Sequence, residues 1–134
     1  MILAWYALNV TVFGLDHIQL AMPAGKEDDA RQFYSALLGL VEIPKPANLV
    51  KRGGCWFKGE AVTIHLGVDA DFRPQRKAHP ALLVEDLEAL RLMLSLKEIP
   101  VVTDEPLEGY SRLYTEDPFG NRIELMEPTS RKVT

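Results

Sequence analysis

The alternation of hydrophobic and polar positions follows the same order twice along the chain. Residues 15–22 alternate as a strand does and stop at Pro23. Residues 26–38 then place apolar side chains at helical spacing, and Gly39 stands where a helix C-cap is expected. Short strands are predicted to follow at residues 40–43, 48–51, 55–57 and 61–66.

The same order returns after a charged linker at residues 69–77. A strand is predicted at 79–84, and Asp86 is a good N-cap for a helix over 87–97. Three more strands are predicted at residues 101–102, 112–114 and 122–126, the last two separated by an Asp-Pro-Phe-Gly turn that begins at Asp117. The pattern therefore predicts β-α-β-β-β twice, over about 14–68 and 79–127. Each half alone would leave one sheet face bare, so the two are expected to pair as one α+β domain.

The segments outside this repeat are short. Residues 1–13 are strongly apolar but fall below the ~20 residues that a membrane span needs, and they have no basic start typical of a signal peptide. We interpret them as an apolar arm that contacts a second copy, an extra strand, or the result of a start codon placed too early. Residues 14–128 form the single domain, and residues 129–134 form a polar tail.

Composition narrows the function classes. The chain has 134 residues, and 15 basic against 19 acidic side chains give a net charge of −4. No run of Lys or Arg suggests a nucleic-acid surface, and no stretch is long enough for a membrane helix. The single cysteine, Cys55, excludes an intramolecular disulfide and favours a reducing, cytoplasmic location.

Four polar side chains share one property: each alternates against aliphatic neighbours on a predicted strand. They are His17, His65, His79 and Glu124. The aliphatic face of each strand should pack on a helix, which turns the polar residue to the other side. If the strands belong to one curved sheet or two matched ones, three imidazoles and a carboxylate line one concave surface. Such a set suits a divalent cation.

Further polar residues are candidates for contact with a substrate on that surface. Gln19 and Thr63 share the face of the histidines by alternation, and Arg112 and Tyr114 lie on an inner strand. An arginine beside a metal would suit an anionic substrate, while the alternative for Arg112 is a solvated charge. No residue is identified as a catalytic base or nucleophile.

Three stretches of the sequence resemble a known superfamily. They are Leu15-Asp16-His17-Ile18, Phe33-Tyr34 with Leu38-Gly39-Leu40, and the stretch from Asp117 to Glu124, which is the most specific. The superfamily is that of the vicinal oxygen chelate proteins, which includes glyoxalase I, fosfomycin-resistance thiol transferases, extradiol dioxygenases and bleomycin-resistance proteins. The resemblance covers about Gly14 to Pro128.

The resemblance implies a fold and a metal site. Two βαβββ modules would form a cup-shaped, eight-stranded mixed sheet, usually in a homodimer, with a metal ion in the cup. Family ligands come from the first and last strand of each module, and His17, His65, His79 and Glu124 fall on those four positions. Zn, Ni, Mn or Fe would be compatible with such ligands.

The reaction subtype stays open among lyase or isomerase, thiol transferase and dioxygenase. Glyoxalase I commonly has a glutamate where His65 stands, which argues against that activity. His17, His79 and Glu124 match the ligand set of extradiol dioxygenases, but those enzymes are usually longer and keep further acid/base residues. The expected function is a divalent-metal-dependent enzyme acting on a small oxygenated molecule, which can be anionic. The alternative is a metal-free small-molecule binding protein similar to the bleomycin-resistance proteins.

Overall fold

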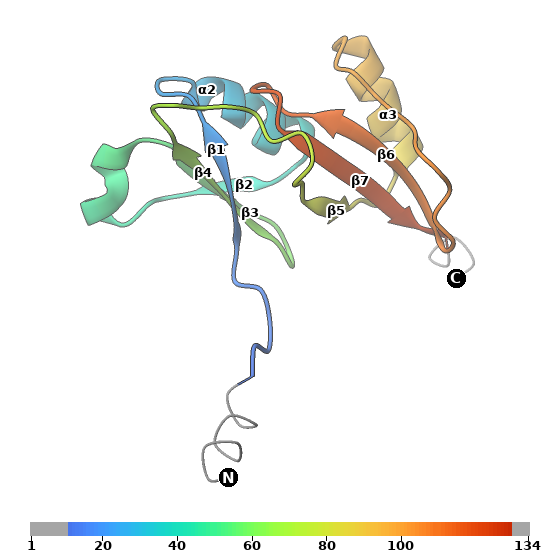
Figure 1. The fold of residues 1–134 in the computed structure, drawn as a ribbon, viewed down its shortest axis with the longest axis horizontal. Coiled ribbons are helices and arrows are strands. Elements are labelled where there is room, and N and C mark those ends of the chain that lie inside the picture. Colours follow the sequence, from blue (N-terminus) through green and yellow to red (C-terminus); the bar gives the residue numbers. More distant parts are fainter. Residues whose placement is uncertain (1–10, 130–134) are drawn as a thin grey trace, which may run out of the picture.

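The computed structural model describes residues 11–129, and its first sheet is built from the N-terminal half of the chain (Figure 1). The sheet has four strands in the order β1 (Ile18–Met22), β4 (Thr63–Val68), β3 (Cys55–Lys58) and β2 (Val41–Ile43). β1 runs parallel to β4, and the other neighbours are antiparallel. β1 is therefore an edge strand with one side unpaired within this part of the chain.

The second sheet repeats this arrangement with the C-terminal half. It has the order β5 (Ala81–Leu83), β7 (Arg122–Pro128) and β6 (Tyr110–Glu116), with β5 parallel to β7 and β6 antiparallel to it. The α+β class and the doubled β-α-β-β order are confirmed. The strand predicted at 101–102 is reduced to one antiparallel bridge between Val102 and Tyr114. Pro100 lacks an N–H, so it cannot extend this pairing as a donor. Residues 11–129 thus form two sheets with seven strands, and the bridge takes the place of the eighth.

The helix predicted at 26–38 is present and widens part-way along. α2 (Glu27–Ala30) continues without a break into the π-helical segment η1 (Arg31–Leu37). At its end the Leu38 amide donates to the Phe33 carbonyl five residues back, at 3.0 Å. The apolar stripe that predicted the helix is buried, including Phe33 and Tyr34.

The prediction of a strand at 48–51 was wrong. The segment is a 3-10 helix, η2 (Ala47–Arg52). Pro46 precedes it with a φ of −55°, and the Leu49 amide donates back to the Pro46 carbonyl at 2.8 Å. Proline at this place favours a turn, and two apolar residues in a row were too short a pattern to distinguish a strand from a turn.

The helix predicted at 87–97 is α3 (Leu87–Leu96), and its cap is the predicted one. The Asp86 carboxylate accepts a hydrogen bond from the Ala89 amide at 3.0 Å. The inner face of α3 joins one apolar core with residues of both halves, among them Phe57, Ile64, Leu113 and Leu125. Cys55 is buried in this core, where burial above all, and the nearby charge of Glu42, raise the pKa of its thiol to about 11. A buried neutral thiol fits a packing role.

A buried polar network joins the two halves. Asp117, which is 3% exposed, accepts hydrogen bonds from the Tyr34 hydroxyl at 2.7 Å and from the Asn121 side chain at 2.9 Å. The Asn121 amide group also donates to the Ala21 carbonyl in β1 at 2.8 Å. The Asp-Pro-Phe-Gly turn therefore ties the C-terminal half to the helix and the edge strand of the N-terminal half.

The two ends of the chain are described only in part. Of the arm predicted over 1–13, residues 1–10 lie outside the described residues, while 11–13 have no regular structure and are exposed. From residue 15 back to residue 11, the described chain runs away from the body of the fold (Figure 1). Of the tail predicted over 129–134, only residue 129 is described. Between residues 11 and 129 there is no helix of the length and apolar character that a membrane crossing requires.

Candidate metal-binding site

The register of the two sheets places the four predicted ligands in two equivalent pairs. In the first sheet Gln19 lies opposite His65, and His17 stands two residues before Gln19. In the second sheet Ala81 lies opposite Glu124, and His79 stands two residues before Ala81. Side chains two residues apart on a strand share a face. Each half of the repeat therefore presents one pair at the start of its edge strand.

The first pair is part of a column of stacked rings. The His65 ring lies between those of His17 and Trp56, with centroid separations of 4.0 and 3.8 Å. Burial first, and then the neighbouring His17, lower the pKa of His65, so its imidazole is neutral at pH 7. A neutral imidazole has the free lone pair that a metal ligand needs.

Asp16 orients the ring of His17. Its carboxylate Oδ2 lies 2.9 Å from His17 Nδ1. An ionised carboxylate only accepts hydrogen bonds, so we assign the proton of the imidazole to Nδ1. Nε2 of His17 is then the nitrogen with the free lone pair. This is the support that metal-binding histidines commonly receive from a neighbouring oxygen.

The second pair shows the same support and a closer approach. His79 Nδ1 lies 2.8 Å from the Lys77 carbonyl oxygen, which can only accept, so the proton is again assigned to Nδ1. His79 Nε2 faces Glu124 Oε1 at 3.0 Å. A lone pair on Nε2 and a carboxylate oxygen repel at this distance unless a cation, either a proton or a metal ion, relieves the repulsion. The donor set therefore fits a divalent metal ion.

Arg112 holds the other oxygen of Glu124. Its Nη1 donates to Glu124 Oε2 at 3.1 Å and to the Tyr114 hydroxyl at 2.9 Å, and its Nη2 donates to the Glu105 carbonyl at 2.6 Å. The hydrogen bond to Glu124 raises the pKa of Arg112, which stays a cation. The charge of Arg112 is thus committed to fixing Glu124 with Oε1 turned toward His79.

Gln19 and Thr63 lie on the face of the first pair, as alternation predicted. Thr63 begins β4 two residues before His65, and Gln19 faces His65 across the strands. Gly67 leaves room for the side chain of Gln19, because a Cβ at Gly67 would lie 2.6 Å from Gln19 Nε2. A larger side chain at position 67 would therefore displace the amide of Gln19 from its present place.

The structure brings the four predicted ligands together two by two. His17 and His65 are on the first sheet, and His79 and Glu124 are on the second. Among residues 11–129, no group of three or more His, Cys, Asp or Glu side chains converges on one point. A single copy of the chain, over these residues, does not bring all four side chains to one point. The site made of all four stays a prediction.

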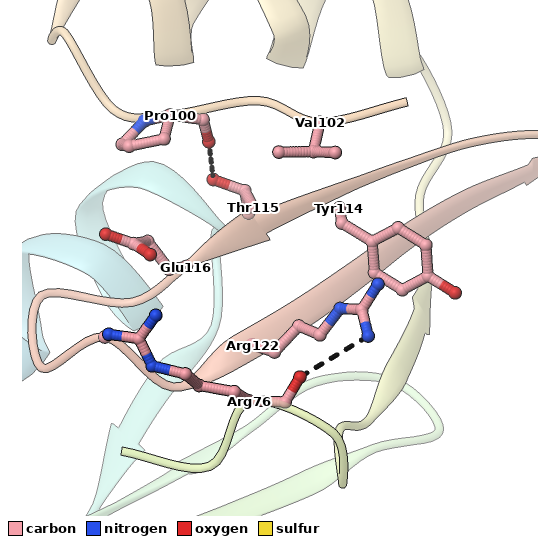
Figure 2. A pocket seen from close by; sticks show the side chains of 8 residues that line it. Arg76, Pro100, Val102, Tyr114, Thr115, Glu116 and Arg122 are labelled. Carbon is pink, nitrogen blue, oxygen red and sulfur yellow. Dashed lines mark hydrogen bonds between the residues drawn. The ribbon is translucent and has the colours of Figure 1, made fainter. Parts of the chain in front are cut away.

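Sequence reasoning missed a cavity beside the second pair. It measures about 180 Å³ and is lined among others by Arg76, Arg122, Tyr114 and Glu116 (Figure 2). Tyr114 lines the cavity, and its ring contacts the His79 ring edge-on, with 5.2 Å between the ring centroids. Arg122 precedes Glu124 by two residues, so alternation along the last strand was the signal that places it on the same face.

Comparisons with known proteins place the chain in a family. No family model and no curated protein sequence matches it. Among solved structures, a protein assigned to the glyoxalase family from Bacillus anthracis is 45% identical with a TM-score of 0.83, over 90% of this chain and 98% of that one.

More distant structures share the fold. A glyoxalase/dioxygenase from Nostoc punctiforme is 18% identical with a TM-score of 0.66, over 89% of this chain and 98% of that one. The fosfomycin resistance protein FosX from Listeria monocytogenes is 16% identical with a TM-score of 0.70, over 92% of this chain and 98% of that one. Together with the doubled β-α-β-β order, the 45% identity shows that the chain belongs to the glyoxalase family of the vicinal oxygen chelate superfamily.

Proposed function

We propose that this chain binds a divalent metal ion through His17, His79 and Glu124, with His65 as a fourth ligand, and acts as an enzyme on a small oxygenated molecule. The observation that carries the proposal is the approach of His79 Nε2 to Glu124 Oε1 at 3.0 Å, with His79 Nδ1 at 2.8 Å from the Lys77 carbonyl oxygen. Zn, Ni, Mn and Fe all accept such nitrogen and oxygen donors.

The complete site is proposed to lie between two copies of the chain. One copy would supply His17 and His65, and the other would supply His79 and Glu124. β1 and β5 support this arrangement, because within residues 11–129 each is an edge strand with an unpaired side. Leu15, which precedes β1, and Leu83, which ends β5, are 77% and 68% exposed. A homodimer that covers both edges would bury them.

The residues of this chain would prepare the site for chemistry. When bound, the metal ion supplies Lewis acidity that polarises a carbonyl or stabilises a negatively charged oxygen of the substrate. Asp16 would hold the imidazole of His17, and the Lys77 carbonyl that of His79, in the tautomer that leaves Nε2 free. Arg112 fixes the Glu124 carboxylate on the second sheet. Gln19 and Thr63 would offer hydrogen bonds on the face of the first sheet that carries His65.

Metal analysis of the protein purified without a polyhistidine tag tests the proposal. We expect about one divalent ion per chain in the wild type. His79→Ala and Glu124→Gln should each weaken metal binding by more than the ~10–100-fold that loss of a supporting residue costs. Glu60→Gln, at an exposed glutamate, is the matched control and should bind as the wild type does. Absence of metal from replete wild-type protein would contradict the proposal, and wild-type affinity in both variants would show that other residues are the ligands.

A mixing experiment tests whether the site is shared between copies. His17→Ala and Glu124→Gln chains, each defective alone, are co-expressed with two different tags that contain no histidine, and the mixed dimer is isolated. A shared site predicts one intact site per mixed dimer, made of His17 and His65 from one chain and His79 and Glu124 from the other. Metal titration should then restore wild-type affinity at half the wild-type stoichiometry. If each site lies within one chain, the mixed dimer regains none.

A second candidate function is a metal-free small-molecule binding protein. Arg112 favours it, because its guanidinium already supplies a cation to Glu124 at 3.1 Å. In that case the wild type would hold no divalent ion, and the contact between His79 Nε2 and Glu124 Oε1 would be a hydrogen bond. The metal analysis above therefore also distinguishes the two functions.

A further inference from the structure

We propose that the cavity bounded by Arg76, Arg122, Tyr114 and Glu116 binds a carboxylate group of the substrate. This inference rests on the proposed function for the place of the metal ion and adds the chemical class of the substrate. The cavity is about 180 Å³, below the ~300–1,000 Å³ of sites that hold whole drug-sized ligands. Its size suits one end of a small molecule.

Arg122 is the anchor of the cavity. Its guanidinium carbon lies 3.9 Å from the centroid of the Tyr114 ring, a cation–π contact that holds the group in place. Nη1 donates to the Arg76 carbonyl at a long 3.4 Å. Within residues 11–129, Arg122 has no ion pair with a carboxylate. A planar guanidinium that is positioned but unpaired is suited to bind a carboxylate through two parallel hydrogen bonds.

Backbone hydrogen bonds bring Arg76 to the same place. The Arg122 amide donates to the Gln75 carbonyl at 2.9 Å, and the Gln75 amide donates to Asn121 Oδ1 at 3.1 Å. These bonds fasten the linker between the two halves to the start of β7. Figure 2 shows Arg76 and Arg122 on the same side of the cavity, with Arg122 turned toward Tyr114 and Arg76 turned toward Glu116.

The charges of the cavity favour a single negative charge. Arg76 and Arg122 contribute two positive charges, and Glu116, which lies opposite Arg122 across the strands, contributes one negative charge. The remaining charge of +1 is balanced by a carboxylate, whereas a dianionic phosphate or phosphonate would leave a net charge of −1 beside Glu116. Arg112, predicted as the anion-binding residue, is already paired with Glu124.

The cavity lies close enough to the proposed metal ligands for one small molecule to reach both. Arg122 and Glu124 are two residues apart on β7, which sets their Cα atoms about 7 Å apart on one face of the sheet. A molecule held at both places would chelate the metal ion through two oxygens and carry its carboxylate a few bonds away. The inferred substrate class is therefore a small monocarboxylic acid with a separate pair of adjacent oxygen functions.

Titration of the metal-free, ¹⁵N-labelled full chain tests the cavity apart from the metal. The probes are propionate, its neutral analogue propionamide, and methylphosphonate as the dianion. Propionate should shift the Arg122 side-chain Nε–H and the Val102 and Thr115 amides, and propionamide should not. Arg122→Gln should weaken propionate binding by about 10-fold or more, because it removes the charged donor of two hydrogen bonds to the carboxylate. Arg76→Gln, at an exposed residue, should weaken it about threefold.

Arg73→Gln is the matched control, since Arg73 is an exposed arginine of the same linker outside the cavity. It should leave propionate binding unchanged. Equal shifts with propionamide, or unchanged binding in Arg122→Gln, would overturn the proposal. Tighter binding of methylphosphonate than of propionate would overturn the choice of a carboxylate. If Arg122→Gln does not fold, Arg122→Lys takes its place, because it keeps the charge and removes the planar group. The comparison of propionate with propionamide on the wild type then still tests whether the cavity binds a carboxylate.

The outcome is separable from that of the metal experiment. Propionate binding without metal binding supports the cavity within a metal-free binding protein. Metal binding without propionate binding would exclude the cavity as a carboxylate site and would leave the proposed metal site standing.

Discussion

Replacement of Asp117 by alanine is expected to lower the free energy of unfolding by about 3–5 kcal/mol. The Asp117 carboxylate accepts four hydrogen bonds, from the Tyr34 hydroxyl, the Asn121 side chain, and the Phe119 and Asn121 amides, at 2.7 to 2.9 Å. Tyr34 and Asn121 are fully buried, so the donors left behind would have no water to replace the carboxylate. The loss should also loosen the contact between the two halves of the chain.

Urea denaturation followed by circular dichroism measures this loss. Asp71→Ala, at an exposed aspartate of the linker, is the control and should change the stability by less than about 0.5 kcal/mol. A loss below about 1 kcal/mol for Asp117→Ala would show that the network does not hold the two halves together.

Gly54→Ala should have an effect of similar or larger size through sterics alone. Gly54 has a φ of +80°, and a Cβ there would lie 2.0 Å from the Leu66 carbonyl oxygen. The backbone of β4 cannot move aside as a flexible side chain could, since β4 is paired on both sides. We expect a loss of at least about 3 kcal/mol or failure to fold, measured by thermal denaturation of the soluble protein.

Gly39→Ala separates the two causes of that loss. Gly39 has nearly the same φ of +79°, but a Cβ there would meet nothing within 4 Å. Only the strain of the left-handed conformation remains, which costs about 1–2 kcal/mol. Equal losses for Gly39→Ala and Gly54→Ala would show that the approach to Leu66 is not the cause.

The long periodic segments of the fold were predictable from sequence. The alternation in β1, the helical stripe with Phe33 and Tyr34, and the Asp86 cap each depend on local geometry that a few residues specify. The short segments were not. Ala47–Arg52 forms a helical turn, and the region of Val102 keeps one bridge of a predicted strand. Two or three apolar residues fit either structure, so tertiary contacts decide.

The candidate site was predictable as far as the face of each residue, because alternation determines the side of the sheet. The pairing of His17 with His65 and of His79 with Glu124 follows from strand register, which alternation does not specify. The Arg112 contact with Glu124 also depends on register, so sequence alone left Arg112 open between substrate contact and solvated charge. The position of Arg76 could not be predicted from the sequence. It is set by hydrogen bonds of the neighbouring Gln75, in a linker that has no hydrophobic periodicity.

The sequence stretch that most resembled the superfamily turns out to have two parts with different roles. Its first residues, Asp117 to Asn121, form the buried network that joins the halves. Its last residues, Arg122 and Glu124, face the cavity and the His79 pair. The resemblance is therefore strong evidence for the fold and says less about the reaction.

The register that makes the two halves equivalent also shows how far they have diverged. The first half presents rings across neighbouring strands, with His17, His65 and Trp56 in one stack. The second half presents charged groups at the equivalent place, Glu124, Arg112 and Arg122, beside the rings of His79 and Tyr114. The two halves thus share a backbone order, while their side chains at equivalent places differ in kind. A molecule bound between a first half and a second half would meet ring faces on one side and charged groups on the other, and this difference would set its orientation.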